Sequence, residues 1–260
     1  MSARPASRWA PLLAAALLAS GCRTPLPAVA PLPSDDPRPA ALLEALLRKS
    51  SEVRAVRGTA RVSIEGRRGG SFAKQVVLIE RPARLRVEVI GLLNQRVAVL
   101  ATDGEQYQLY RAENGAVESG AVRPSVLLEV AGLPLPPGEA VSLLLGGPRP
   151  DPDGWRPGPA AALADGGMRV ELAGPAREVR RSFEFDAESN LRRYQIHAPD
   201  GELLLEVRYE DLRRVSERAF PHSVGLDFPA IGTKAHVSWR SVELNPELPA
   251  SLFRLELPST

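Results

Sequence analysis

The sequence predicts a mainly β protein of the α+β class, in which one antiparallel sheet of about ten or eleven strands curls around short helices. Short runs in which apolar and polar residues alternate recur between turn residues on both sides of the midpoint of the chain. Two segments with helical periodicity lie between these runs, and another precedes the first of them. Because so large a sheet curls, we expect the short helices to plug its concave face.

The N-terminal residues resemble the processing signal of bacterial lipoproteins. Arg4 and Arg8 precede an apolar run at 11–19, and Cys22, the only cysteine, follows shortly after it within the sequence LASGC. The run is too short to cross a bilayer as a helix. We therefore expect residues 1–21 to be a cleaved signal peptide, and the resemblance implies that Cys22 carries acyl chains as a lipid anchor. The alternative is an ordinary secretory signal with Cys22 left unpaired.

The residues that follow Cys22 indicate where the protein is held. Arg23 stands where enterobacterial inner-membrane lipoproteins carry Asp, and this resemblance implies the outer membrane, with the domain on its periplasmic face. Residues 22–39 contain six prolines, which favour an extended backbone, so we expect a semi-rigid tether here. Residues 40–260 remain, enough for a single domain with a sizeable core.

The first half of this domain is expected to be a helix followed by a meander. An amphipathic helix is predicted at 40–53, where Leu42, Leu43, Leu46 and Leu47 share one face. Alternating patterns predict strands at 59–65, 71–81, 85–89, 97–99 and 107–110. The sequence Asn-Gly at 114–115 is typical of a hairpin turn, so antiparallel hairpins are the economical connection.

The pattern changes in the middle of the chain. Two short helices are predicted at 125–130 and 138–145, divided by the proline-rich turn 132–137, which cannot lie inside a helix. A loop rich in Pro, Gly and Asp follows at 146–159. Strands are then predicted at 168–172, 178–186, 191–197, 203–212, 223–228 and 235–244, with a turn and a final strand within 246–258.

Alternation along these strands predicts which side chains face the interior. The interior-facing residues are Val62, Ile64, Val77, Ile79, Leu85, Val87, Val89, Val97, Val99, Phe183, Phe185, Leu203, Leu205, Val207, Val237 and Trp239. Periodicity alone does not distinguish a filled core from a vacant cavity, and both alternatives stay open at this point.

Composition and motifs argue against several classes of function. The expected leader carries two of the 33 basic residues and none of the 31 acidic ones, so the mature chain is balanced in charge and has no tract suited to nucleic acid. His197, His222 and His236 are far apart in the sequence and lack the spacing of metal ligands. Phosphate-binding glycine loops, dinucleotide fingerprints and nucleophile elbows are missing from the sequence. We therefore expect a non-enzyme that needs no cofactor.

The run 56–147 contains three distinctive segments, VRGTARVSI at 56–64, RLRVEVIGLLNQRVAVL at 84–100 and LLEVAGLPLPPGEAVSLLLG at 127–146. Through these segments the run resembles the family of the outer-membrane lipoprotein receptor LolB and, more loosely, its periplasmic carrier relative LolA. The last segment is the most specific, because LolB has a similar helix, Gly, proline-containing turn and second helix. The C-terminal half resembles the family only in its abundance of strands.

The resemblance implies a half-open β-barrel closed by helices, whose apolar hollow holds the acyl chains of lipoproteins in transit. The residues implied to line this cavity are the interior-facing residues named above, except Leu203, Leu205 and Val207. Leu127 and Leu144 from the predicted helices complete the lining. In LolB a leucine protrudes between two early strands and helps deliver lipid to the membrane. Here Leu93, with Leu92 beside it, occupies that place, although Leu92 replaces the family's proline.

The implied function is that of a lipid-anchored receptor, a monomer, that takes acylated lipoproteins from a LolA-like periplasmic carrier and helps insert them into the outer membrane. Two other hypotheses keep the predicted fold. One is a tethered module that binds another lipid or hydrophobic ligand, because a fold does not dictate a function. The other is a structural or regulatory envelope lipoprotein with a filled core.

Overall fold

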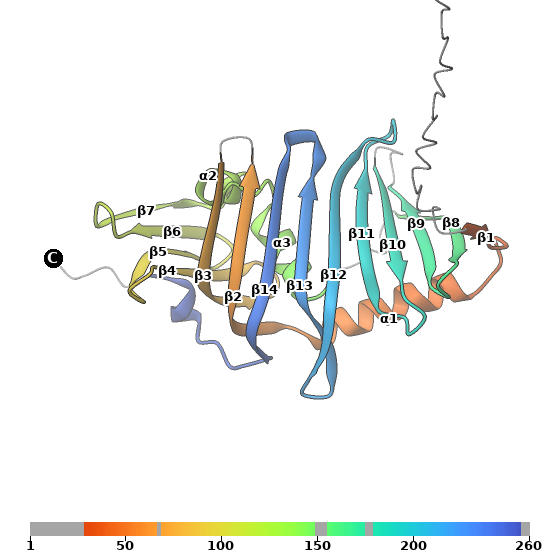
Figure 1. Ribbon diagram of the computed structural model, residues 1–260, viewed down its shortest axis with the longest axis horizontal. Coiled ribbons are helices and arrows are strands. Elements are labelled where there is room, and N and C mark those ends of the chain that lie inside the picture. Colours follow the sequence, from red (N-terminus) through yellow and green to blue (C-terminus); the bar gives the residue numbers. More distant parts are fainter. Residues whose placement is uncertain (1–28, 67–68, 149–154, 175–178, 256–260) are drawn as a thin grey trace, which may run out of the picture.

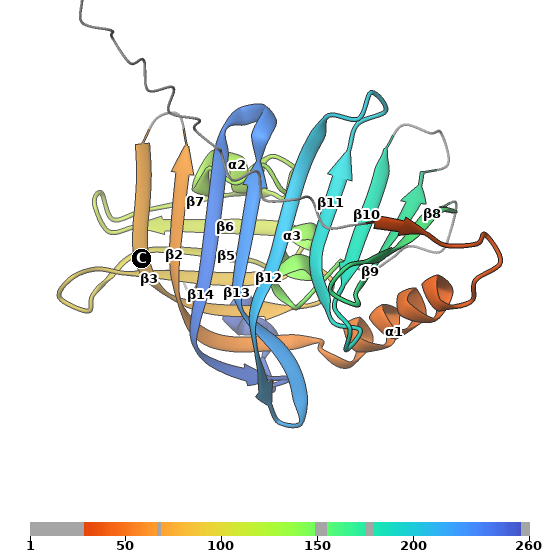
Figure 2. The same ribbon diagram turned by 45° about the vertical axis from the view of Figure 1, so that its right-hand side comes forward.

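The computed structural model describes residues 29–66, 69–148, 155–174 and 179–255, and within them one curled antiparallel sheet of 14 strands (Figures 1 and 2). The predicted fold class, mainly β with a few short helices, is confirmed. The strands of the first half are β1 (Val29–Pro31), β2 (Ala55–Gly66), β3 (Gly69–Glu80), β4 (Arg84–Ile90), β5 (Arg96–Thr102), β6 (Gln106–Arg111) and β7 (Ala116–Ala121). The strands of the second half are β8 (Arg156–Leu163), β9 (Met168–Ala173), β10 (Arg180–Phe185), β11 (Leu191–His197), β12 (Leu203–Val215), β13 (Arg218–Phe228) and β14 (Thr233–Leu244).

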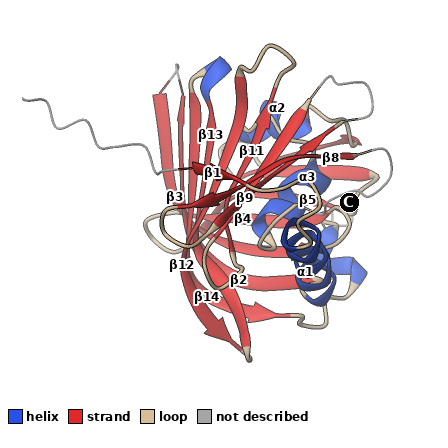
Figure 3. Cartoon of the chain, turned by 90° about the vertical axis from the view of Figure 1, so that its right-hand side faces the viewer, coloured by secondary structure: helices blue, strands red, loops and turns tan. Residues whose placement is uncertain are grey.

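Three α-helices lie on the concave face of the sheet (Figures 2 and 3). They are α1 (Arg38–Glu52), α2 (Val126–Ala131) and α3 (Pro137–Leu144), each within two residues of its predicted position. Helix α1 begins slightly earlier than expected, because Pro39 is compatible with the first turn of a helix. Between α2 and α3, Gly132 has a φ of 72° and ends the first helix, as the Gly-Pro turn predicted.

Two sequential meanders meet in the middle of the sheet. The strand order is β1-β8-β9-β10-β11-β12-β13-β14-β2-β3-β4-β5-β6-β7, so β2 to β7 form the predicted first meander and β8 to β14 the second. The last strand, β14, pairs with the first long one, β2, with Val237 opposite Val62. The long connection from β7 to β8 carries α2 and α3, and Figure 1 shows α3 behind the middle of the sheet, near β13 and β14, and α2 behind the ends of β2 and β3.

The sheet has more strands than predicted because two proline-containing segments join one edge, and β7 forms the other edge after the Asn-Gly turn. Residues 29–31, within the predicted tether, form β1, and the expected loop 146–159 gives way to β8 from Arg156 onward. Pro157 lies in the part of β8 that β1 does not reach, where its missing N–H breaks no ladder bond on that side. Of the predicted tether, 29–39 therefore belongs to the folded domain, and 22–28 lies outside the described residues.

The final strand expected within 246–258 was wrong for its described part. A 3-10 helix, η2 (Ala250–Phe253), forms instead, as a second 3-10 turn, η1 (Pro229–Ile231), does between β13 and β14. Pro249 precedes η2, and the turn lets Phe253 pack with Leu78 on the convex face of the sheet, where the chain gains a small second core. Residues 256–258 of that predicted strand lie outside the described part of the chain.

Candidate functional site

Most of the residues predicted to line a cavity face the concave side of the sheet. Nine are buried in the main core: Val62, Val77, Ile79, Leu85, Leu127, Phe183, Phe185, Val237 and Trp239. Ile64, Val87 and Leu144 are partly buried against this core. Val89 is partly exposed and shares its face with Val87, two residues away on β4. Three tyrosines of this face, Tyr107, Tyr194 and Tyr209, were not among the predicted residues, although they continue the same alternation.

Val99 does not share that face, and Val97 lies outside the regular ladder, which corrects the prediction for β5. Val89 pairs with Ala98 and Glu88 pairs with Val99, so Val99 shares the convex face with Glu88. The register shifts at the Val89–Ile90 step, and Val97 is the extra residue there. Such a bulge exchanges the faces of the residues around it, and alternation within a single strand does not reveal it.

The concave face is filled by the protein's own side chains in this structure. Leu46 of α1, Val126 of α2 and Val141 and Leu143 of α3 are buried against the strands, together with the large ring of Trp239. The open hollow that the family resemblance implies is therefore occupied by helices here. Any acyl chain bound on this face would have to displace them.

Unpaired polar atoms lie buried in the core that the helices cover. The hydroxyls of Tyr194 and Tyr209 and the indole Nε1 of Trp239 are buried without a hydrogen-bond partner among the described residues. Burial raises the pKa of both tyrosines, so their hydroxyls stay protonated. Burial also raises the pKa of Glu139 on α3. An unsatisfied buried polar group costs about 1–3 kcal/mol, which makes this helix-covered core less favourable than a fully apolar one.

Helix α3 is also held by polar contacts at its rim. The Nη1 of Arg81, just after β3, donates to the Ser142 hydroxyl at 3.0 Å, and its Nε donates to the carbonyl oxygen of Val53 at 3.2 Å. Arg81 thus joins the end of α1, the end of β3 and helix α3. These contacts are directional, unlike the continuous apolar packing of the strands.

The loop between β4 and β5 exposes the two leucines that the resemblance singled out. Leu92 and Leu93 have relative exposures of 105% and 88%. The loop closes on itself, since the Gly91 amide donates to the carbonyl oxygen of Gln95 at 2.8 Å and the Asn94 amide donates to that of Gly91 at 3.0 Å. Asn94 has a φ of 61°, a conformation that Asn tolerates better than most residues. A short, closed turn therefore projects both leucines into solvent.

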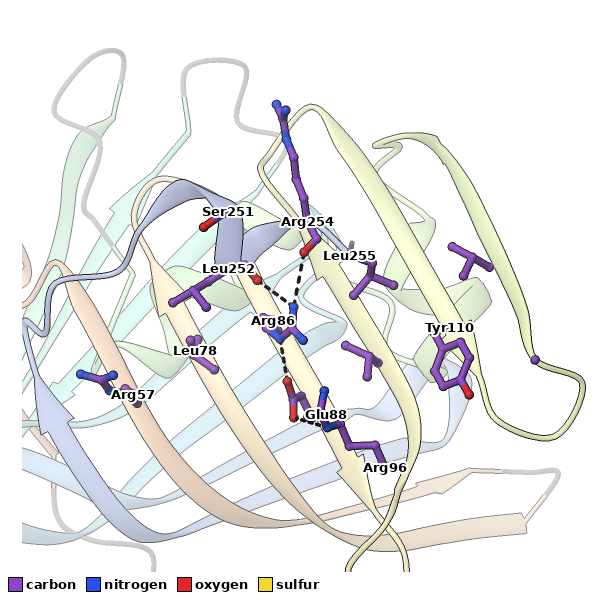
Figure 4. Close-up of a pocket in the computed structure, with 13 residues that line it drawn as sticks. Arg57, Leu78, Arg86, Glu88, Arg96, Tyr110, Ser251, Leu252, Arg254 and Leu255 are labelled. Atoms are coloured by element: carbon purple, nitrogen blue, oxygen red, sulfur yellow. Dashed lines mark hydrogen bonds and ion pairs between the residues drawn. The ribbon is translucent and has the colours of Figure 1, made fainter. Parts of the chain in front are cut away.

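A groove of about 840 Å³ lies on the convex face, beside this loop (Figure 4). Leu78, Val99 and Leu252 give it apolar walls, and Arg86 and Glu88 cross its floor at 2.7 Å from each other. The guanidinium of Arg86 also donates to the carbonyl oxygen of Leu252 at 2.9 Å, which ties the C-terminal segment to β4. The groove is separate from the concave face, and the sequence did not predict it, because it forms only where residues 251–255 cross the sheet.

The described residues hold neither a membrane-spanning helix nor a cluster of metal ligands. Within 29–66, 69–148, 155–174 and 179–255, no helix is long and apolar enough to cross a membrane. In the same ranges, no three His, Cys, Asp or Glu side chains come together as metal ligands. The predicted signal peptide 1–21 and Cys22 lie outside these residues.

Comparison with known proteins shows the fold. No protein-family model matches the sequence, and no curated protein matches it. A LolA superfamily protein from Nitrosomonas europaea has a similar structure, with a TM-score of 0.53 and 13% identity over 82% of this chain and 97% of that one. A DUF1329 family protein from Desulfovibrio piger has a TM-score of 0.55 and 9% identity, over 84% of this chain and 98% of that one. A putative outer-membrane lipoprotein-sorting protein domain from Vibrio parahaemolyticus has a TM-score of 0.51 and 8% identity, over 82% of this chain and 97% of that one. At these identities the likeness establishes a LolA-like fold.

Proposed function

We propose that this protein is a lipid-anchored receptor on the periplasmic face of the outer membrane, which binds the acyl chains of lipoproteins and helps insert them into that membrane. The observation that carries the proposal is the closed β4–β5 loop with two almost fully exposed leucines, Leu92 and Leu93, on a LolA-like fold. Two adjacent leucines in water are unfavourable unless an apolar phase receives them. A bilayer is such a phase for a protein anchored through Cys22.

The acyl chains would bind on the concave face after α2 and α3 move away. The proposal is supported there by the apolar strand residues beneath the helices and by the unpaired hydroxyls of Tyr194 and Tyr209. Transfer from a LolA-like carrier needs no nucleotide if the receptor binds the acyl chains more tightly than the carrier does. Each 1.4 kcal/mol of difference between the two binding free energies favours the receptor tenfold. The membrane must bind the chains more tightly still, and the leucine loop would lower the barrier to release.

Replacement of Leu92 and Leu93 by Glu tests the role of the loop. Because both side chains are exposed, we expect the free energy of unfolding to change by less than about 0.5 kcal/mol. Lipoproteins should nevertheless fail to reach the outer membrane, and membrane fractionation should find them in the other envelope fractions. The double change to Gln is the control for size without charge, and it should have a weaker effect. Normal sorting with the Glu variant would refute the proposed role.

A second candidate is favoured by the filled concave face: a structural or regulatory envelope lipoprotein that binds no acyl chain. Mass spectrometry of the protein purified without detergent distinguishes these two candidates from each other and from a module of the same fold that carries another lipid or hydrophobic ligand as its cargo. Co-purified acylated peptides support the receptor, and other lipids support the alternative cargo. An interior without any lipid, also after incubation with a diacylated peptide, supports the structural protein.

A further inference from the structure

Phe72, on β3 near the β2–β3 hairpin, is the most exposed aromatic ring among the described residues, with a relative exposure of 71%. It pairs with Ser63 of β2, whereas Val77 and Ile79 of the same strand face the core, so Phe72 lies on the convex face. A single exposed apolar residue is common and needs no explanation by itself. The cations that lie beside Phe72 are a less common feature.

Two cations, Arg61 and Lys74, sit next to Phe72. Arg61 and Lys74 lie directly opposite each other on β2 and β3, on the same convex face. Like charges in this arrangement destabilise a sheet. Neither makes an ion pair among the described residues, although other cations of this face do, as Arg169 does with Glu184. The next acid along the convex face of β2 is Glu65, which lies opposite Lys234.

These cations are continuous with the leucine loop. Lys74 donates to the Asn94 side-chain oxygen at 3.4 Å, so its ammonium reaches the loop that carries Leu92 and Leu93. Arg96, the first residue of β5 after that loop, is exposed, and its Nε lies 3.5 Å from the Oε2 of Glu88. Apolar side chains flanked by cations are the pattern that suits a bilayer with anionic lipids.

The position of the anchor constrains how the domain meets a membrane. Strand β1, where the described chain begins, and the β4–β5 loop lie at opposite ends of the molecule (Figure 1). Ten interstrand steps separate β1 from β4, about 48 Å measured along the curled sheet. The seven residues from Cys22 to Val29 span at most about 25 Å. With the anchor and the loop both in one bilayer, opposite ends of the domain reach the same surface, which favours an orientation with the domain lying along it.

We propose that the convex face around Phe72, Arg61 and Lys74 docks on a bilayer that contains anionic phospholipid. The ring of Phe72 enters the headgroup region beside the leucine loop, and the two cations meet lipid phosphates. This inference rests on the proposed function, because it takes the anchor and the loop as the two ends of the contact. It adds the face that is turned to the membrane and the class of lipid that this face selects.

The test uses the full, acylated protein in vesicles of phosphatidylcholine, with or without phosphatidylglycerol. Phe72→Trp supplies a reporter whose fluorescence is quenched by brominated lipid chains, and the parent protein gives the background from Trp155 and Trp239. We expect quenching of the new tryptophan in the anionic vesicles. Arg61→Gln and Lys74→Gln should each lower the ratio of docked to undocked protein about fivefold in those vesicles.

Arg48→Gln is the matched control, since Arg48 is exposed on α1, which lies on the concave side. It should change the docked ratio little. Equal effects of Arg48→Gln and Lys74→Gln would overturn the inference. A tryptophan at position 93 (Leu93→Trp) separates this inference from the proposed function. If that residue is quenched and the one at position 72 is not, the loop enters the membrane but the convex face does not dock.

Discussion

A disulfide between α3 and the sheet should block acyl-chain binding if cargo enters beneath the helices. A Cβ placed on Gly138, the second residue of α3, would lie 3.6 Å from the Cβ of Ala83 in the β3–β4 turn. Disulfides join Cβ atoms about 3.5–4.5 Å apart. The same Cβ comes no closer than 3.4 Å to the carbonyl oxygen of Pro82, so the double change Ala83→Cys and Gly138→Cys fits without a clash.

The energies involved decide what the crosslink should do. An acyl chain of about fifteen methylenes contributes about 12 kcal/mol when fully buried, at about 0.8 kcal/mol per methylene. Lifting α3 exposes Val141 and Leu143, at a cost of about 1.5–3 kcal/mol each, so cargo can displace the helix in the unlocked protein. The crosslink closes a loop of about 55 residues and should raise the free energy of unfolding by about 4 kcal/mol.

The assay compares one protein in two redox states. Binding of a fluorescent diacylated peptide is titrated with the oxidised double variant and again after reduction, and Ala83→Cys alone controls for the thiol. We expect at least a tenfold loss of affinity on oxidation and full recovery on reduction. Equal affinity in both states, with the crosslink verified by mass, would refute entry beneath α3.

Three further predictions concern stability. Gly58→Ala should lower the free energy of unfolding by about 1–3 kcal/mol in denaturant titrations, because its Cβ would overlap the carbonyl oxygen of Ser241. Gly66→Ala, whose Cβ would have no atom closer than 3.4 Å, should lower it less. Equal losses of stability would contradict this packing. Tyr209→Phe should leave stability unchanged or raise it by up to about 1 kcal/mol, and a clear loss would mean that the buried hydroxyl has a partner. Because burial raises the pKa of Glu139, the folded state holds a proton that the unfolded state has lost, so stability should fall as the pH rises from the unfolded pKa through the folded one. Glu139→Gln should flatten this part of the curve of unfolding free energy against pH, and an unchanged slope would contradict the assignment.

The strands and helices themselves were predictable from local patterns. Alternation marked the long strands, and the Gly-Pro turn marked the boundary between α2 and α3 to within a residue or so. The patterns failed at the edge, where Pro157 stands in β8, because partner strands and not local preference make that segment extended. They failed again at Val97 and Val99, because a bulge changes faces only when two strands are paired.

By itself the sequence determined the antiparallel strands and the short helices, because each depends on local periodicity or on residues near in the chain, and the family resemblance pointed to the loop of Leu92 and Leu93. Only the tertiary structure decided that the concave face is occupied by those helices, that the hydroxyl of Tyr209 has no partner there in the described part of the chain, and that Arg61 and Lys74 lie side by side next to Phe72. These features arise from strand register and from contacts between residues far apart in the chain, which local patterns do not encode.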